Sequence, residues 1–127
     1  MLNTKDFENL MVVLENGVKV LNLCPHPVTY RDEKGDTVFD SVGKDNALRL
    51  PVESSEEKIG GINFGKTKVL PIELPEQVDG VLYVVPTLIR TTYSDRKDFI
   101  SPTTDPKKII KNEKGFTEAV LKFDVNW

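Results

Sequence analysis

The sequence predicts a mainly β (α+β) protein: a small antiparallel barrel or sandwich with one N-terminal helix. Two observations lead to this class. Up to Gly17 the apolar residues recur at helical spacing, whereas after Gly17 they fall in seven or eight short runs separated by turn residues. A chain of 127 residues that is 39% apolar suits one domain, with a helix at residues 3–16 and a β-rich body at residues 18–127.

The helix is predicted from its apolar stripe and its ends. Phe7, Leu10 and Leu14 share one helical face, which we expect to pack on the core. Asn3 or Thr4 can cap the first turn, and Gly17 is a suitable stop.

The β-rich body begins with a strand at Val18–Leu23 and a hairpin around Gly35, which can take a positive φ. Further short strands are predicted at Ala47–Leu50, Ile62–Phe64 and Lys66–Leu70.

Within the most apolar segment, Val81–Tyr93, the continuous run Val81–Val85 reads as a strand buried on both faces, with Pro86 at a bulge, a bend or an edge. Ser94–Pro106 reads as a long loop. A last hairpin follows, and Phe116–Trp127 forms its half-buried antiparallel strand.

Composition argues against several classes of protein. The net charge of −3 disfavours a nucleic-acid binder, and no segment resembles a signal sequence or a membrane span. One cysteine and one histidine allow no disulfide within the chain and give no set of zinc ligands. We therefore expect a cytoplasmic protein with no metal, no cofactor and no membrane partner.

Residues Gly60–Thr67 satisfy the phosphate-binding pattern GxxxxGK[ST], but their context is wrong for it. A phosphate-binding loop needs a buried strand before it and a helix after it. Here an acidic stretch, Glu53–Glu57, precedes the pattern, and Pro71 follows it closely. The sequence instead indicates a glycine turn that leads into a strand.

Two segments carry the candidate binding residues. Pro25 and Pro27 stiffen the backbone around His26, although a stiff loop whose histidine caps a backbone carbonyl or lies exposed is the favoured interpretation. In the second segment Arg90 and Arg96 offer forked donors for an anion, and Tyr93 has a ring that can stack on a base. Local arginine–aspartate pairs on a solvated loop are the competing interpretation. A nucleophilic pair of Cys24 and His26 is disfavoured, because no third residue is available to orient it.

These segments resemble motifs of a family of small, mostly uncharacterised proteins from phages, prophages and bacteria. The family pattern L-N-L-T-P-H-x-V is similar to Leu21–Val28, with Cys24 in place of threonine. The later pattern Y-[IV]-V followed by R-x-D-L-x-x-P is similar to Tyr83–Val85 and Arg96–Pro102. The resemblance covers about residues 18–115 and adds Asn22, His26, Arg96 and Asp98 to the candidate site; it implies no secure activity.

We therefore predict a non-catalytic accessory protein of phage type. Its pocket would hold a small anionic ligand, plausibly a nucleotide signal of host defence, and would be formed by His26, Arg90 and Arg96, with subunits of a homo-oligomer contributing. The alternative is a protein-binding module that inhibits a host protein through its surface, with Glu53–Glu57 as the contact.

Overall fold

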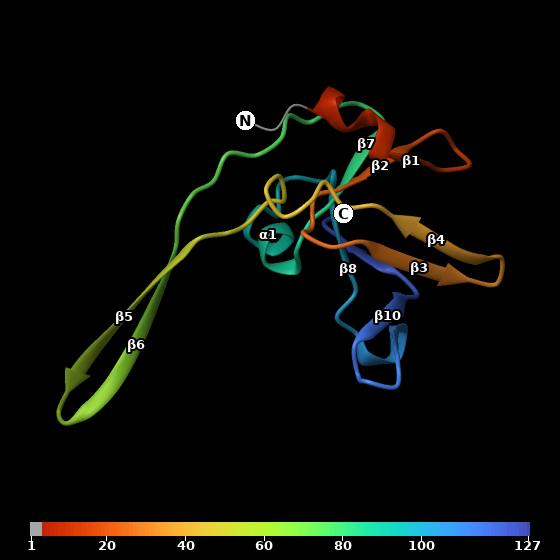
Figure 1. Ribbon diagram of the computed structural model, residues 1–127. Coiled ribbons are helices and arrows are strands. Elements are labelled where there is room, and N and C mark those ends of the chain that lie inside the picture. Colours follow the sequence, from red (N-terminus) through yellow and green to blue (C-terminus); the bar gives the residue numbers. More distant parts are fainter. Residues whose placement is uncertain (1–3) are drawn as a thin grey trace.

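The computed structural model describes residues 4–127, which form a mainly β protein with one short α-helix (Figure 1). No helix in that range is long and apolar enough to cross a membrane. In chain order the elements are η1 (Thr4–Leu10), β1 (Val12–Val13), β2 (Lys19–Asn22), β3 (Val28–Asp32), β4 (Gly35–Phe39), β5 (Val52–Ile59), β6 (Ile62–Val69), β7 (Val81–Val84), α1 (Thr87–Thr92), β8 (Phe99–Pro102), η2 (Pro106–Lys108), β9 (Ile109–Lys111), β10 (Thr117–Val120) and β11 (Phe123–Val125).

The central sheet has five strands in the order β1-β2-β7-β8-β11. Its three inner strands run parallel, so Leu21 lies level with Tyr83, and Tyr83 with Phe99. The two edge strands are antiparallel to their neighbours. The prediction of a purely antiparallel body is therefore wrong, because the connections after β2 and β7 return the chain to the same end of the sheet.

A second sheet has the order β4-β3-β10-β9. The predicted hairpins around Gly35 and before Phe116 are both present in it, as β3–β4 and β9–β10. β10 joins β3 in parallel through one level pair, Val120 and Tyr30. Within residues 4–127 the sheets form no closed barrel, so only the coarser prediction of a mainly β fold is confirmed.

The core consists of two apolar clusters, one on each face of the central sheet. One face packs against α1, η1 and the segment before β7, and its largest buried side chains are Tyr83 and Phe99. The other face supplies Val20, Val84 and Ile100 to a cluster that the second sheet completes. Alternate residues of the same strands thus serve two layers, as expected for strands buried on both faces.

The N-terminal segment corrects the prediction of a helix at residues 3–16. A 3-10 helix ends at Leu10, and Val12–Val13 then pair with β2 as strand β1. β-Branched valines favour the extended backbone, and Gly17, at φ +87°, belongs to the turn between β1 and β2. The predicted cap Asn3 lies outside the described residues.

The buried strand predicted at Val81–Val85 is present as β7, but residues 86–106 differ from their prediction. Pro86 is the N-cap residue of helix α1, which begins at Thr87. The predicted loop contains β8, which is buried between β7 and β11. The predicted final strand is divided into β10 and β11.

A two-stranded hairpin, which we call the arm, projects from the body (Figure 1). The arm consists of β5 and β6, so the acidic stretch Glu53–Glu57 is a strand. Its base is fixed to the body, because the preceding Leu48 is buried in the core and the following Ile72 packs against the same cluster. Every residue of the arm is exposed.

Candidate functional site

His26 and Arg96, from the two predicted binding segments, lie at opposite ends of the parallel strands. His26 follows the carboxyl end of β2, in a cleft that also contains Pro102 from the carboxyl end of β8. Arg96 precedes β8 and bonds to the segment that leads into β7, so it lies at the amino ends of these strands. One chain therefore does not bring His26 and Arg96 into a common pocket.

Arg96 and Asp98 form a buried ion pair in which the guanidinium grips both carboxylate oxygens. Nε–Oδ1 is 2.8 Å and Nη2–Oδ2 is 2.7 Å, while the side chains are 15% and 5% exposed. Arg96 also donates to the Pro75 carbonyl at 2.9 Å and lies over the Phe99 ring at 4.4 Å. The hydrogen bonds to Asp98 are the main cause of the raised pKa of the Arg96 guanidinium. Its donors hold the segment before β7 in place.

Arg90, on α1, fixes the C-terminal segment. It donates to Ser101 Oγ at 2.7 Å, to the Val125 carbonyl at 3.2 Å and to Asn126 Oδ1 at 3.0 Å. The Asn126 amide in return donates to the carbonyls of Arg90 and Arg96, each at 3.1 Å. The predicted anion donor thus serves as a structural clasp in this chain.

Tyr93 and Asn22 are likewise engaged within the fold. The Tyr93 hydroxyl accepts a hydrogen bond from the Ile72 amide at 3.3 Å. Asn22 is buried, and its amide donates to the carbonyls of His26 at 3.0 Å and Phe39 at 2.9 Å. Its Oδ1 accepts from the Cys24 amide at 2.9 Å. Asn22 therefore shapes the loop that carries His26, which gives this matched motif residue a structural role.

His26 itself is exposed, with Nδ1 3.2 Å from the Pro27 carbonyl. It borders a cleft of about 200 Å³ where β3 and β10 separate beyond their single level pair. That volume is below the 300–1,000 Å³ typical of small-molecule sites. The lining residues are His26, Pro27, Val28, Thr29, Pro102, Thr103, Ile109, Thr117, Glu118, Ala119 and Val120. This lining contains a carboxylate and no arginine or lysine.

Cys24 is unsuited to nucleophilic chemistry beside His26. Its side chain is 3% exposed, and burial raises the pKa of the thiol to about 12. A nucleophilic cysteine needs thiolate near neutral pH. No group of three or more potential metal-ligating side chains (His, Cys, Asp or Glu) occurs in the part of the chain that the structure describes.

The arm is a further candidate site, and it contains Glu53–Glu57, the contact predicted for the alternative protein-binding module; its hairpin structure was not predicted. Its two strands pair along their whole length from Val52–Val69 to Ile59–Ile62. Gly60 and Gly61 form the turn with φ of +60° and +84°, as a type I′ hairpin requires. The GxxxxGK[ST] residues therefore form a turn and a strand rather than a phosphate-binding loop. Two glycines between isoleucines were the available signal.

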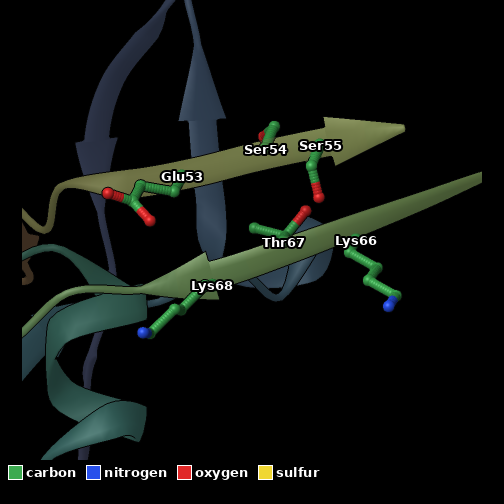
Figure 2. Close-up of a pocket in the computed structure, with 6 residues that line it drawn as sticks. All are labelled: Glu53, Ser54, Ser55, Lys66, Thr67 and Lys68. Carbon is green, nitrogen blue, oxygen red and sulfur yellow. The ribbon is translucent and has the colours of Figure 1, made fainter. Parts of the chain in front are cut away.

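Apolar side chains gather on one face of the arm near its tip. Because directly paired residues of a hairpin share a face, Ile59, Ile62 and Phe64 lie on the same face as Glu57. The exposed fractions of the three apolar side chains are 56% for Ile59, 62% for Ile62 and 48% for Phe64. Lys66 and Lys68 continue the same face toward the base, and Figure 2 shows them projecting from one side of β6. We call this surface the lysine face.

No protein-family model matches this chain, and searches of curated proteins and of solved structures find no similar protein. The resemblance to the phage and bacterial family therefore stays a prediction.

Proposed function

We propose that this chain is a non-catalytic protein-binding module whose binding element is the arm. The observation that carries this proposal is a fully exposed hairpin with apolar side chains at its tip and two strand edges that pair with no other strand of residues 4–127.

A free arm of this kind is an unfavourable element for an isolated protein. A two-stranded hairpin is at best marginally stable in water, and exposed strand edges invite pairing with other chains. Every residue of the arm is exposed, so the arm contributes no buried side chain to the core of the body. A protein partner that adds a strand or covers the tip stabilises the arm and gives it a role.

A photo-crosslinking amino acid at position 64 tests this proposal in cells that produce the chain. We expect a specific crosslinked protein, which can be a second copy, from position 64 and none from position 116. Phe116 is the matched control, because it is an aromatic residue that is 68% exposed but lies outside the arm. Equal crosslinking from both positions, or none from position 64, contradicts the proposal.

Binding of a small anionic molecule, as first predicted from the sequence, is the second candidate function. The His26 cleft is the observation that favours it, with an exposed imidazole beside several threonines. Calorimetry against a panel of nucleotides, with His26→Ala as the comparison, tests it. No heat of binding at micromolar concentrations removes this candidate. A phage origin and a role against host defence likewise stay predictions.

A further inference from the structure

The arm's free strand edges set the geometry of any strand pairing. In a hairpin closed by a two-residue turn, the pair beside the turn is hydrogen-bonded and the next pair is not, and the two kinds then alternate. Ile59 and Ile62 flank the turn and are therefore a hydrogen-bonded pair. The hydrogen bond from the Leu70 amide to the Pro51 carbonyl fits the same alternation at the base of the arm. The outward amides are therefore Val52, Ser54, Glu56 and Lys58 on β5, and Asn63, Gly65, Thr67 and Val69 on β6.

The body restricts how two arms can pair. Adjacent strands lie about 4.8 Å apart, so two arms that point the same way would place their bodies about 10 Å apart. The five-stranded sheet alone is about 19 Å wide at that spacing. Paired arms must therefore point in opposite directions, and antiparallel pairing then joins β5 to β5 or β6 to β6.

Charge disfavours pairing through β5. That strand carries three glutamates and one lysine. Of the two antiparallel registers that overlap the strand most fully, one places Glu53 opposite Glu57 of the other copy. The other register places Glu56 opposite itself. Like charges directly opposite each other destabilise a sheet.

Charge permits one register through β6. Lys66 and Lys68 are its only ionised side chains, and both lie in the half nearest the body. In the register centred on Gly65, Lys66 lies opposite Phe64 of the other copy and Lys68 opposite Ile62. Each lysine stem then covers an apolar side chain, and each ammonium group keeps a carboxylate on its own β5: Glu57 pairs with Lys66 at 3.4 Å, and Glu53 is level with Lys68.

Gly65 provides independent support for this register. A glycine within a strand weakens it and often marks a close backbone approach. Gly65 has no positive φ, and a Cβ built on it would meet nothing within 4 Å in its own chain. Packing within one chain therefore does not explain this glycine.

We propose that the partner of the arm is a second copy of this chain, and that the β6 strands of two copies pair antiparallel about a two-fold axis at Gly65. The result is a four-stranded sheet, β5-β6-β6-β5, with the two bodies at its opposite ends. This inference rests on the proposed function and specifies the partner.

Two proline variants, at residues that pair with each other across the arm, test this geometry. Sedimentation velocity of the full-length chain measures whether each variant is a monomer or a dimer. Ser54 and Thr67 are cross-strand partners with outward amides, one on each edge. We expect a dimer for the unmodified chain at about 100 µM, a dimer for Ser54→Pro and a monomer for Thr67→Pro, because proline removes an edge donor without breaking the hairpin ladder. Ser54→Pro also controls for the cost of proline to the arm.

A charge variant tests the register separately. Ile62→Lys places a lysine opposite Lys68 of the other copy, and the two symmetry-related contacts should weaken dimerisation by about two- to thirty-fold. Adding Lys68→Thr should restore it, because this change removes the like charge without placing a carboxylate opposite Glu53 of the same arm. Hydrogen exchange on the dimer should protect the outward amides of β6 and leave those of β5 exchanging rapidly.

A monomeric unmodified chain overturns the inference, as does loss of the dimer in Ser54→Pro or failure of Lys68→Thr to restore dimerisation of Ile62→Lys. If the purified chain is a monomer while position 64 crosslinks a different protein in cells, the inference fails and the proposed function stands. If position 64 crosslinks nothing and the chain is a monomer, both fail.

Discussion

Replacing Arg96 by methionine should destabilise the protein by about 3–5 kcal/mol, because it leaves Asp98 as a buried carboxylate without its partner. Asp98 is 5% exposed, so water does little to compensate for the lost guanidinium. The variant also loses the bond to the Pro75 carbonyl. A domain of this size has about 5–15 kcal/mol of stability in total, so the effect is large.

Equilibrium unfolding in urea measures this change. Far-UV circular dichroism is the suitable probe, because Trp127 is 69% exposed and reports poorly on the core. Arg49→Met is the matched control: Arg49 is exposed, with one 3.5 Å bond to a carbonyl, and should change stability by less than about 0.5 kcal/mol.

A double-mutant cycle separates the ion pair from the rest of the side chain. Asp98→Ala should be destabilising alone, and the double variant should lose about 1–3 kcal/mol less than the sum of the single variants. A loss below about 1 kcal/mol for Arg96→Met would refute the structural role and return Arg96 to the ligand-binding candidates.

Three further predictions concern the core and the C-terminal clasp. Burial is the main cause of the raised pKa of Tyr83 in the folded protein. Because the neutral phenol is favoured in the folded state, its stabilising effect is complete below the pKa of the unfolded chain, which is near 10. That stabilisation is lost as the pH rises through the pKa of the folded state. Urea midpoints at pH 9 and pH 11 should therefore differ more for the unmodified chain than for Tyr83→Phe, and equal differences would contradict this. The thiol of Cys24, with its pKa at about 12, should react with a disulfide reagent at pH 8 only as fast as the protein opens, and rapid labelling of the native state would count against its burial. Asn126→Ala should cost about 1–3 kcal/mol in thermal unfolding, because three hydrogen bonds that join α1 and the Arg96 turn to the C-terminal segment are lost; an unchanged melting temperature would show that the clasp contributes little.

Local patterns in the sequence predicted the hairpins and missed the elements that tertiary packing decides. Gly35 was identified as a turn glycine because its chemistry is local, and its φ is +122°. The parallel order of β2, β7 and β8 depends on connections that no local pattern encodes. β8 has four residues and ends at a proline, so its strand character comes from its position between β7 and β11.

The candidate binding residues were chosen for their chemistry, and that chemistry is used inside the fold. An arginine side chain donates hydrogen bonds to carboxylates and carbonyls of its own chain as readily as to a ligand. Sequence alone does not separate these structural and ligand-binding roles. Arg90 and Arg96 turn inward to Ser101 and Asp98. The sequence predicts Glu53–Glu57 as a protein contact but not as a strand, because this stretch contains no apolar residue, although the Gly60–Gly61 turn indicated the hairpin.

The placement of β10 has a consequence for folding kinetics. This strand lies between β3 and β9, and it links the early hairpin to the β9 strand in the second sheet. Val120 of β10 is level with Tyr30 of β3, so this sheet is complete only when two segments far apart in the chain meet. Pairing between such distant segments is expected to make folding slow, with β3 and β9 left as open edges until β10 docks.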